Sequence, residues 1–314
     1  RHETLHGSSF MNPKNIAASV RQRLMNHAKL TGEAFNLILV RYGHERLLYR
    51  LSVSPHKEEL ILKGGSLFYV WTDQLHRPTK DLDFLGSGRP DVQRIRSLFA
   101  DIISIKAVDD GLAFDQDNLV ADEIREDQQY EGIRVKLTAS LGNARIHLQA
   151  DIGFGDATVP PPVEVEYPTL LDFPQPRLRA YAKETVVAEK LEAMVDLGFT
   201  NSRMKDFYDL HRFAEHFDFD GRSLANAITS TFQRRQTSIP NETPTAFTNE
   251  FFQDNDKNRQ WNAFASKLQS DQSLEQVVTA IADFVVPCLS AVRSGIEFNA
   301  VWRGGTWIHE TRET

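Results

Sequence analysis

The sequence predicts an α+β protein in two parts: a first part that combines helices with a mixed sheet, and a second part built of helices. In the first part, some stretches have apolar residues at helical spacing, and others are short apolar runs bounded by turn residues, as strands are. Beyond a proline-rich segment at 158–181, helical spacing prevails, and this predicts the helical part.

The elements of the first part follow in chain order. Apolar residues at helical spacing predict two opening helices, the first over 13–30 and the second reaching about residue 52. A further helix is expected at 89–104, where the apolar residues again lie on one face. Short apolar runs predict the strands, which we expect at 60–63, 81–86, 133–142 and 144–155.

The prolines between 160 and 176 exclude a regular helix or a central strand there, so a domain boundary is expected. Helices should follow, the last of them kinked or ended by Pro287. The expected helices are 183–198, 202–217, 223–237, 245–268 and 273–292. The expected organisation is a polar tail at 1–10, a first domain at 11–165, a helical domain at 166–300 and a C-terminal tail at 301–314.

Composition narrows the classes of protein. The single cysteine, Cys288, excludes an internal disulfide framework, and no stretch approaches about 18 consecutive apolar residues, so a cytoplasmic protein without a membrane span is expected. The net charge of −7 argues against a protein that coats nucleic acid over its whole surface. A local basic patch remains open.

An Asp-Leu-Asp sequence at 81–83 is the first candidate for chemistry. Strand side chains alternate between faces, so Asp81 and Asp83 should share one face while Leu82 and Phe84 point to the core. Two carboxylates so close favour a divalent cation between them, and oxygen ligands suit Mg²⁺ or Mn²⁺. The alternative is a strand end at which both acids are solvated.

A tight turn upstream supplies the context for these acids. Gly64 and Gly65 allow a sharp turn and close approach of a ligand, and Ser66 offers a hydroxyl and a helix cap. The helix expected after Ser66 would present its N-terminus to an anion. With Lys63 and Arg77 nearby, this turn is the candidate phosphate site of a nucleotide.

A third carboxylate is expected on a neighbouring strand. In the segment 144–155, His147, Gln149 and Asp151 lie on the face opposite the apolar one, which makes Asp151 the candidate third metal ligand and general base. Asp156 is a weaker candidate because it lies beyond Gly155. For Asp151, a solvated acid at a strand edge is the alternative.

The order of these motifs resembles the nucleotidyltransferase superfamily related to DNA polymerase β, and more narrowly the AbiEii/AbiGii toxin family with its MenT-type members. The resemblance rests on the Gly-Gly-Ser turn, the segments "RPTKDLDF" and "ADIGFGD", and the later segments "AEKLEAMVDLG" and "RMKDFYDLHRF". It extends over roughly residues 30–270. The interval from Ser66 to Asp81 is longer than in the shortest family versions.

The resemblance implies a polymerase β-like nucleotidyltransferase domain followed by a helical domain. It also implies roles for residues that match the family motifs: the phosphate turn at Gly65 and Ser66, the metal pair at Asp81 and Asp83, the lysine of the third motif at Lys190, and the acidic helix motif at Asp206 and Asp209.

The implied activity is transfer of a nucleoside monophosphate from an NTP, with Mg²⁺ or Mn²⁺ as cofactor. By resemblance the acceptor is the 3′ end of tRNA, and the protein is the toxin of a toxin-antitoxin pair in phage defence or stress, with a cognate antitoxin as partner. The runner-up acceptor is a protein.

The residues around Lys190 make it a candidate site residue even without the resemblance. Its helical neighbours Val186, Val187, Ala193 and Met194 are apolar, so the lysine lies on the apolar face and requires an anionic partner. We expect it to reach nucleotide phosphate or a catalytic carboxylate; the alternative is a lysine that snorkels at the edge of the stripe. For the acids of the next helix the alternative is a pair between Lys205 and Asp209.

Two other classes of protein remain as alternatives. A metal-dependent nuclease also uses clustered acids and a lysine, but there the acid and lysine share a strand, whereas Glu189 and Lys190 are expected on a helix. A nucleotide-binding protein without turnover would not need the full set of carboxylates. The dispersed histidines make a zinc site unexpected.

Overall fold

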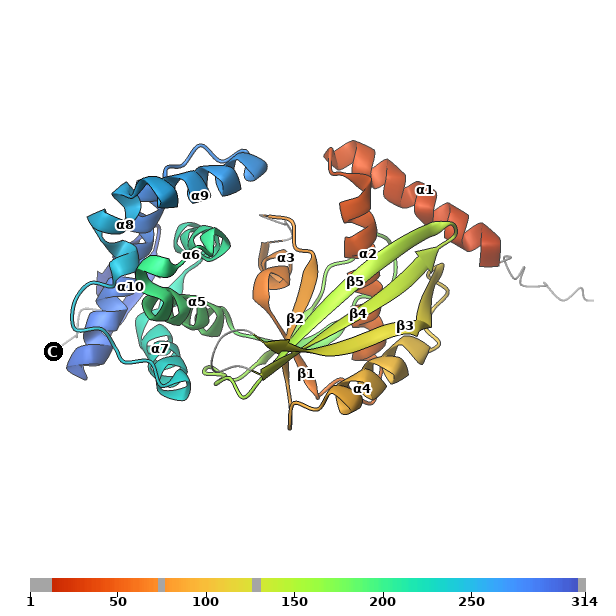
Figure 1. Ribbon diagram of the computed structural model, residues 1–314, viewed down its shortest axis with the longest axis horizontal. Helices are drawn as coiled ribbons and strands as arrows, with labels where there is room; N and C mark the ends of the chain where they lie inside the picture. Colours follow the sequence, from red (N-terminus) through yellow and green to blue (C-terminus); the bar gives the residue numbers. More distant parts are fainter. Residues whose placement is uncertain (1–12, 73–76, 126–130, 310–314) are drawn as a thin grey trace, which may run out of the picture. The chain divides into compact units, whose positions relative to one another are not determined.

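The computed structural model describes residues 13–72, 77–125 and 131–309, so the tail expected at 1–10 lies outside the described residues. The chain forms two compact units (Figure 1). Unit 1 comprises the residues up to Gly155 together with Glu164–Ala180, and unit 2 comprises Asp156–Val163 together with the residues from Tyr181 onward. The boundary expected between 165 and 166 falls within a strand, β6 (Val163–Glu166).

Unit 1 is built on a seven-stranded sheet with the strand order β3-β4-β5-β2-β1-β7-β6. The sheet is mixed, because β2 runs parallel to β5 and β1 parallel to β7, while β1 with β2, β3 with β4 and β4 with β5 are antiparallel. The other strands are β1 (Leu60–Lys63), β2 (Asp81–Gly86), β3 (Leu112–Arg125), β4 (Glu131–Leu141), β5 (Ala144–Phe154) and β7 (Arg177–Ala180).

The helices of unit 1 cover the apolar side of this sheet. Helix α2 packs on β5, and at Gly43 a side chain would collide with Leu148 and Ile146 of that strand, so glycine allows close contact. Helix α4 packs on β3 through a stripe that includes Ile95 and Phe99, both buried. The helices are α1 (Pro13–Thr31), α2 (Phe35–Ser52), the 3₁₀ turn η1 (Gly64–Ser66), α3 (Leu67–Thr72) and α4 (Val92–Ser104).

The mixed sheet and its four expected strands are confirmed, but three further strands were not expected. Between residues 160 and 176 the strand that the structure describes is β6, which lies at the edge of the sheet, in agreement with the exclusion of a central strand there. Strand β7 begins directly after the last of these prolines and lies inside the sheet between β1 and β6. The prolines flank β6 and β7 without interrupting them, and Leu178 and Ala180 are buried. Strand β3 lacks clear alternation because its register with β4 shifts between Asp115 and Val120.

Unit 2 is mainly helical, as expected. Its helices are α5 (Lys183–Leu197), α6 (Met204–His216), α7 (Gly221–Arg235), α8 (Asn249–Gln253), α9 (Asn255–Ala265) and α10 (Leu274–Ser294), with the 3₁₀ turns η2 (Gly198–Thr200), η3 (Thr245–Phe247) and η4 (Ser266–Leu268). Pro287 does not end α10, which continues to Ser294 and is capped by Gly295 in the left-handed conformation.

The expected C-terminal tail at 301–314 is wrong as far as residue 309. Strands β9 (Ala300–Arg303) and β10 (Thr306–His309) form a hairpin that joins β8 (Phe219–Asp220) in a small sheet. Aromatic packing explains this: Trp302 is buried, its indole nitrogen donates to the carbonyl of Ala214, and both Trp302 and Trp307 contact Phe284.

Among the described residues, helix α10 is long and apolar enough to cross a membrane by length and composition. It contacts α6 and α7 within unit 2, and a face that includes Val277, Ile281 and Phe284 is buried. Length and composition are therefore weak evidence of a membrane span for this helix.

Candidate active site

The two aspartates of β2 lie on one face, as the alternation predicts. Leu82 and Phe84 are buried in the core at 0% and 1% exposure, while Asp81 and Asp83 are half-buried on the opposite face. Both carboxylates therefore point to the side of the sheet that could admit a ligand.

The glycine turn lies directly beside Asp83. Strand β1 runs antiparallel to β2 and places Lys63 opposite Asp83, so the turn begins where β2 presents its acids. Gly64 has a φ of +76°, and a Cβ built there would lie 2.0 Å from Oδ2 of Asp83. Only glycine fits both the backbone conformation and the space that this carboxylate occupies.

Arg77 lies against the second glycine of the turn. A Cβ at Gly65 would meet Nη2 of Arg77 at 2.6 Å and Oγ1 of Thr79 at 3.2 Å. Ser66 is 3% exposed, and its hydroxyl donates to the carbonyl of Lys63 at 3.4 Å. The turn thus has a cation beside its backbone, which is an arrangement suited to a phosphate group.

Asp151 is the direct neighbour of Asp83 across the parallel pair of β2 and β5. Its two oxygens accept hydrogen bonds from Arg134 of β4, from Nε at 2.9 Å and from Nη2 at 2.7 Å. Gln149 also donates to Asp151, at 3.2 Å. A bidentate guanidinium therefore holds the carboxylate that the sequence suggests as third ligand.

Within the described residues, no group of three or more His, Cys, Asp or Glu side chains is arranged to hold a metal ion. Arg134 binds both oxygens of Asp151, and the three-carboxylate site stays a prediction. The sequence analysis missed Arg134. The signal was the alternation of Arg134, Lys136 and Thr138, which the register places opposite Asp151, Gln149 and His147.

Lys190, Asp206 and Asp209 form a buried cluster inside unit 2. Nζ of Lys190 on α5 lies 2.6 Å from Oδ1 of Asp206 and 2.9 Å from Oδ2 of Asp209, both on α6. The two aspartate side chains are 5% and 1% exposed, and that of Lys190 is 12% exposed. Lys190 therefore has the anionic partners that its apolar surroundings require, and a role of these groups in catalysis stays a prediction. Asp209 pairs with Lys190 rather than with Lys205, which is exposed.

Asp156, the weaker candidate for a third carboxylate, belongs to another ion-pair cluster of unit 2. Arg235 lies 3.2 Å from Asp156, 3.6 Å from Glu189 and 2.7 Å from Glu192. Burial alone would lower the pKa of Arg235, but these three carboxylates outweigh burial and raise the pKa. A structural role for Asp156 follows.

A family model described as the nucleotidyl transferase AbiEii toxin of type IV toxin-antitoxin systems matches residues 46–284, which is more than half of the 314-residue chain. The chain belongs to this AbiEii family. The match spans every candidate site residue named above, from Lys63 to Asp209. As a member of the AbiEii family the chain is a nucleotidyltransferase toxin, for which an NTP substrate and an antitoxin partner are implied. The nuclease alternative has no support.

Two solved structures align with this AbiEii chain. MenT4, a nucleotidyltransferase toxin from Mycobacterium tuberculosis H37Rv, is 18% identical with a TM-score of 0.48, covering 90% of this chain and 99% of that one. JHP933 from Helicobacter pylori is 17% identical with a TM-score of 0.44, covering 87% of this chain and 94% of that one. No curated protein matches the chain by sequence. The assignment rests on the family model.

Proposed function

We propose that this AbiEii toxin transfers a nucleoside monophosphate from an NTP to an RNA, with the 3′ end of tRNA as the acceptor. The observation that carries the proposal is the contact between the two predicted motifs: the Asp83 carboxylate lies against Gly64, and Arg77 lies against Gly65. A phosphate-binding turn and a pair of acids in contact are what transfer of a phosphoryl group from a nucleotide requires.

In this reaction the 3′ hydroxyl oxygen attacks the α-phosphorus, the bond from that phosphorus to the bridging oxygen of the β-phosphate breaks, and pyrophosphate leaves. The turn at Gly64, Gly65 and Ser66 binds the phosphates, with Lys63 and Arg77 as cations that offset their charge. Asp151 receives the proton of the acceptor hydroxyl, and Arg134 keeps its carboxylate oriented.

A divalent metal fits the residues of this site in part. Asp81 and Asp83 are hard oxygen donors on one face of β2, and such paired charges favour Mg²⁺ or Mn²⁺. They would hold the metal, with Asp151 as the further ligand expected from the sequence. When bound, the metal would neutralise the negative charge that develops on the phosphates.

Lys190, Asp206 and Asp209 are proposed to serve the same reaction through unit 2, because they match the later motifs of the family. In the cell, a nucleotide added to the 3′ end of tRNA blocks aminoacylation and arrests growth, consistent with a toxin role in phage defence or stress. The location proposed is the cytoplasm, where NTPs and tRNA are found.

The test is incubation of the purified protein with total tRNA, Mg²⁺ and each α-³²P-labelled NTP in turn, beside an Asp83→Asn variant. Asn is nearly the same size as Asp, so the variant removes the charge beside Gly64 while preserving packing. We expect labelled tRNA with the wild type, at least about 100-fold less with the variant, and none after EDTA.

Two outcomes would contradict the proposal. Label on a protein band in place of RNA would move the acceptor to protein. Label nowhere, with any of the four nucleotides, would favour a nucleotide-binding protein without turnover.

A further inference from the structure

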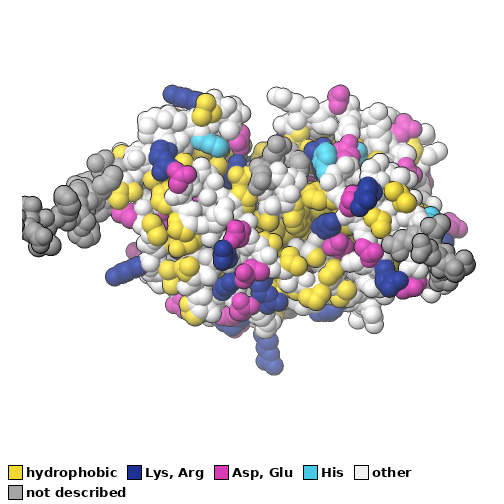
Figure 2. All heavy atoms as spheres, turned by 180° about the vertical axis from the view of Figure 1, so that it is seen from behind, with side chains coloured by type: hydrophobic (Ala, Val, Ile, Leu, Met, Phe, Trp, Pro, Cys, Tyr) yellow, Lys and Arg dark blue, Asp and Glu magenta, His cyan; other side chains and the backbone are white. Residues whose placement is uncertain are grey.

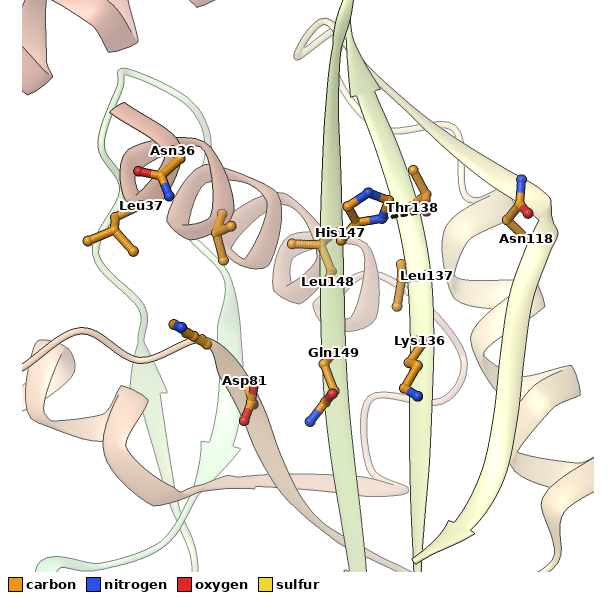
Figure 3. A pocket seen from close by; sticks show the side chains of 12 residues that line it. Asn36, Leu37, Asp81, Asn118, Lys136, Leu137, Thr138, His147, Leu148 and Gln149 are labelled. Carbon is orange, nitrogen blue, oxygen red and sulfur yellow. Dashed lines mark hydrogen bonds between the residues drawn. The ribbon is translucent and has the colours of Figure 1, made fainter. Parts of the chain in front are cut away.

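A pocket of about 520 Å³ opens in unit 1 beside Asp81 (Figure 3). It forms where β2 starts: Asp81 pairs with Gln149 of β5, and the preceding β5 residues 144–148 continue beyond that point, paired with β4. Its walls include Asn36 of α2, Lys80 and Asp81, Lys136 of β4, and His147 and Gln149 of β5.

The order of the strands relates the pocket to the reaction. Strand β1 and the glycine turn lie on one side of β2, and β5 and β4 lie on the other. In phosphoryl transfer the attacking and leaving oxygens lie roughly in line on opposite sides of the phosphorus. If the leaving pyrophosphate is held on the β1 side, the acceptor hydroxyl must approach from the β5 side, where the pocket is.

The charges of the pocket suit a phosphodiester. Lys80 and Lys136 are exposed and form no ion pair with any residue that the structure describes. Among the residues that line the pocket the acidic one is Asp81, which belongs to the proposed metal pair. Two exposed cations that line a pocket attract RNA locally in a protein whose net charge is −7.

The remaining walls suit a nucleoside. The His147 ring points toward Thr138 of β4, and its Nδ1 is 3.2 Å from Oγ1 of Thr138, which orients the ring (Figure 3). Leu37 and Leu148 add apolar surface to the lining of the pocket. Unpaired bases of RNA stack on histidine and aromatic rings, and amide groups such as those of Asn36 and Gln149 bind base edges and the 2′ hydroxyl. A volume of about 520 Å³ is in the range of small-ligand pockets, which is enough for one nucleotide.

We infer that this pocket receives the 3′-terminal nucleotide of the RNA acceptor, with Lys80 and Lys136 bound to the phosphodiester backbone at this end and His147 against the terminal base. The inference rests on the proposed transfer to RNA and names the part of the surface that binds the acceptor.

The test compares Lys136→Ala and His147→Ala with a matched control, Lys106→Ala. Lys106 is also an exposed lysine of unit 1, so the control removes the same charge away from the pocket. Two constants are measured: the KM for tRNA in the labelling assay, and the Kd of a non-hydrolysable NTP analogue in the absence of RNA. Both pocket residues are exposed on the sheet, so we expect both variants to fold.

We expect Lys136→Ala to raise the KM for tRNA by about tenfold, because one phosphate contact is lost. For the same reason, the slope of log KM for tRNA against log salt concentration should fall by about 1. His147→Ala should raise this KM about tenfold with an unchanged salt slope, because stacking is lost. The Kd of the NTP analogue should stay at the wild-type value for both variants, and Lys106→Ala should match the wild type throughout.

Two results would overturn the assignment of the pocket: a KM for tRNA that stays at the wild-type value in both pocket variants, or a Kd for the NTP analogue that rises as much as that KM. In either case the wild type still labels tRNA, so the proposed function stands while the pocket assignment fails. A wild type that labels no RNA overturns the proposed function itself.

Discussion

At the scale of single residues, the site depends on the fit between Gly64 and Asp83. Replacing Gly64 by Ala places a Cβ 2.0 Å from Oδ2 of Asp83 in a backbone conformation, φ +76°, that alanine disfavours. The left-handed conformation costs about 1–2 kcal/mol. The collision also has to move the carboxylate, so we expect the Gly64→Ala variant to lose at least about 100-fold in nucleotide transfer.

The matched control for this prediction is Gly142→Ala. Gly142 also has a positive φ, +59°, but a Cβ there would meet nothing within 4 Å. It should lose about 1–2 kcal/mol in the free energy of unfolding and retain full transfer activity. Equal activity of the two variants would show that the contact between Gly64 and Asp83 has no part in the reaction.

The same scale shows what the sequence could reveal about the site. Alternation along a strand is a local property, and it placed Asp81 and Asp83 on one face and Asp151 on the polar face of its own strand. The guanidinium that binds Asp151 comes from a different strand, and its position depends on the register between β4 and β5. A local pattern does not specify that register, which is why Arg134 was missed.

At the scale of elements, Lys190 joins α5 to α6. Replacing it by Met removes the cation between Asp206 and Asp209, which are 5% and 1% exposed, and leaves two buried carboxylates without its charge. Removing one partner of a buried ion pair costs about 3–5 kcal/mol. We expect a loss of this size in the free energy of unfolding of Lys190→Met, measured by urea denaturation.

Lys205→Met is the control for this change. Lys205 lies four residues before Asp209 on α6 and is exposed, so its loss should change the free energy of unfolding by less than about 0.5 kcal/mol. If Lys205→Met proved as costly as Lys190→Met, the ion pair that stabilises α6 would be the local one within this helix.

Elements with strong local patterns were predictable, and elements defined by distant partners were not. Strands β1 and β2 and helix α10 have compact apolar patterns. Strand β7 has four residues, and it is a strand because β1 offers it a parallel neighbour. The hairpin of β9 and β10 likewise depends on the contacts of Trp302 and Trp307 with Phe284 of α10.

At the scale of the whole molecule, the dependence of stability on pH combines opposing groups. Glu45 of α2 is fully buried, accepts a hydrogen bond from the backbone of Leu170 at 2.7 Å, and has a pKa raised by burial to about 7. Burial of His44 lowers its pKa to about 4. At pH values between its two pKa values, Glu45 is therefore protonated in the folded protein and ionised in the unfolded chain. His44 is neutral in the folded protein at pH values where it is protonated in the unfolded chain.

The sign for Glu45 follows from its proton. Between pH 4.5 and about 7 the folded state binds more protons at Glu45 than the unfolded state, so its contribution to stability is full below pH 4.5 and is lost as the pH rises through 7. The rise in the pKa of Glu45 from 4.5 to about 7 corresponds to a change of about 3 kcal/mol in the free energy of unfolding. For His44 the sign is opposite, and stability rises with pH between about 4 and 6.5.

We therefore expect the free energy of unfolding of the wild type to fall relative to that of Glu45→Gln by about 3 kcal/mol between pH 4.5 and 7.5. Gln keeps an oxygen for the Leu170 amide but does not ionise, and His44 is the same in both proteins. The measurement is urea denaturation at a series of pH values, with Glu58→Gln as an exposed control. Parallel pH curves for wild type and Glu45→Gln would contradict this prediction.

The charge of the whole chain does not predict where RNA could bind. On the face shown in Figure 2, Lys and Arg side chains lie interspersed with Asp and Glu over the described part of the chain. The net charge of −7 averages over this mixture, whereas binding depends on a few cations brought together. Lys80 and Lys136 are 56 positions apart in the sequence and line one pocket because β2, β5 and β4 are adjacent.

The sequence by itself determined the family, the two acids on one strand, the glycine turn before them and the helical second part. Each of these can be recognised from the spacing of residues that are close together in the chain. The tertiary structure alone decided which groups meet, Arg134 with Asp151 and Lys190 with both aspartates of α6, and it placed Lys80 and Lys136 along one pocket. The physical reason is that sheet register and helix packing are set by burial of the whole apolar surface, to which residues distant in the chain contribute together.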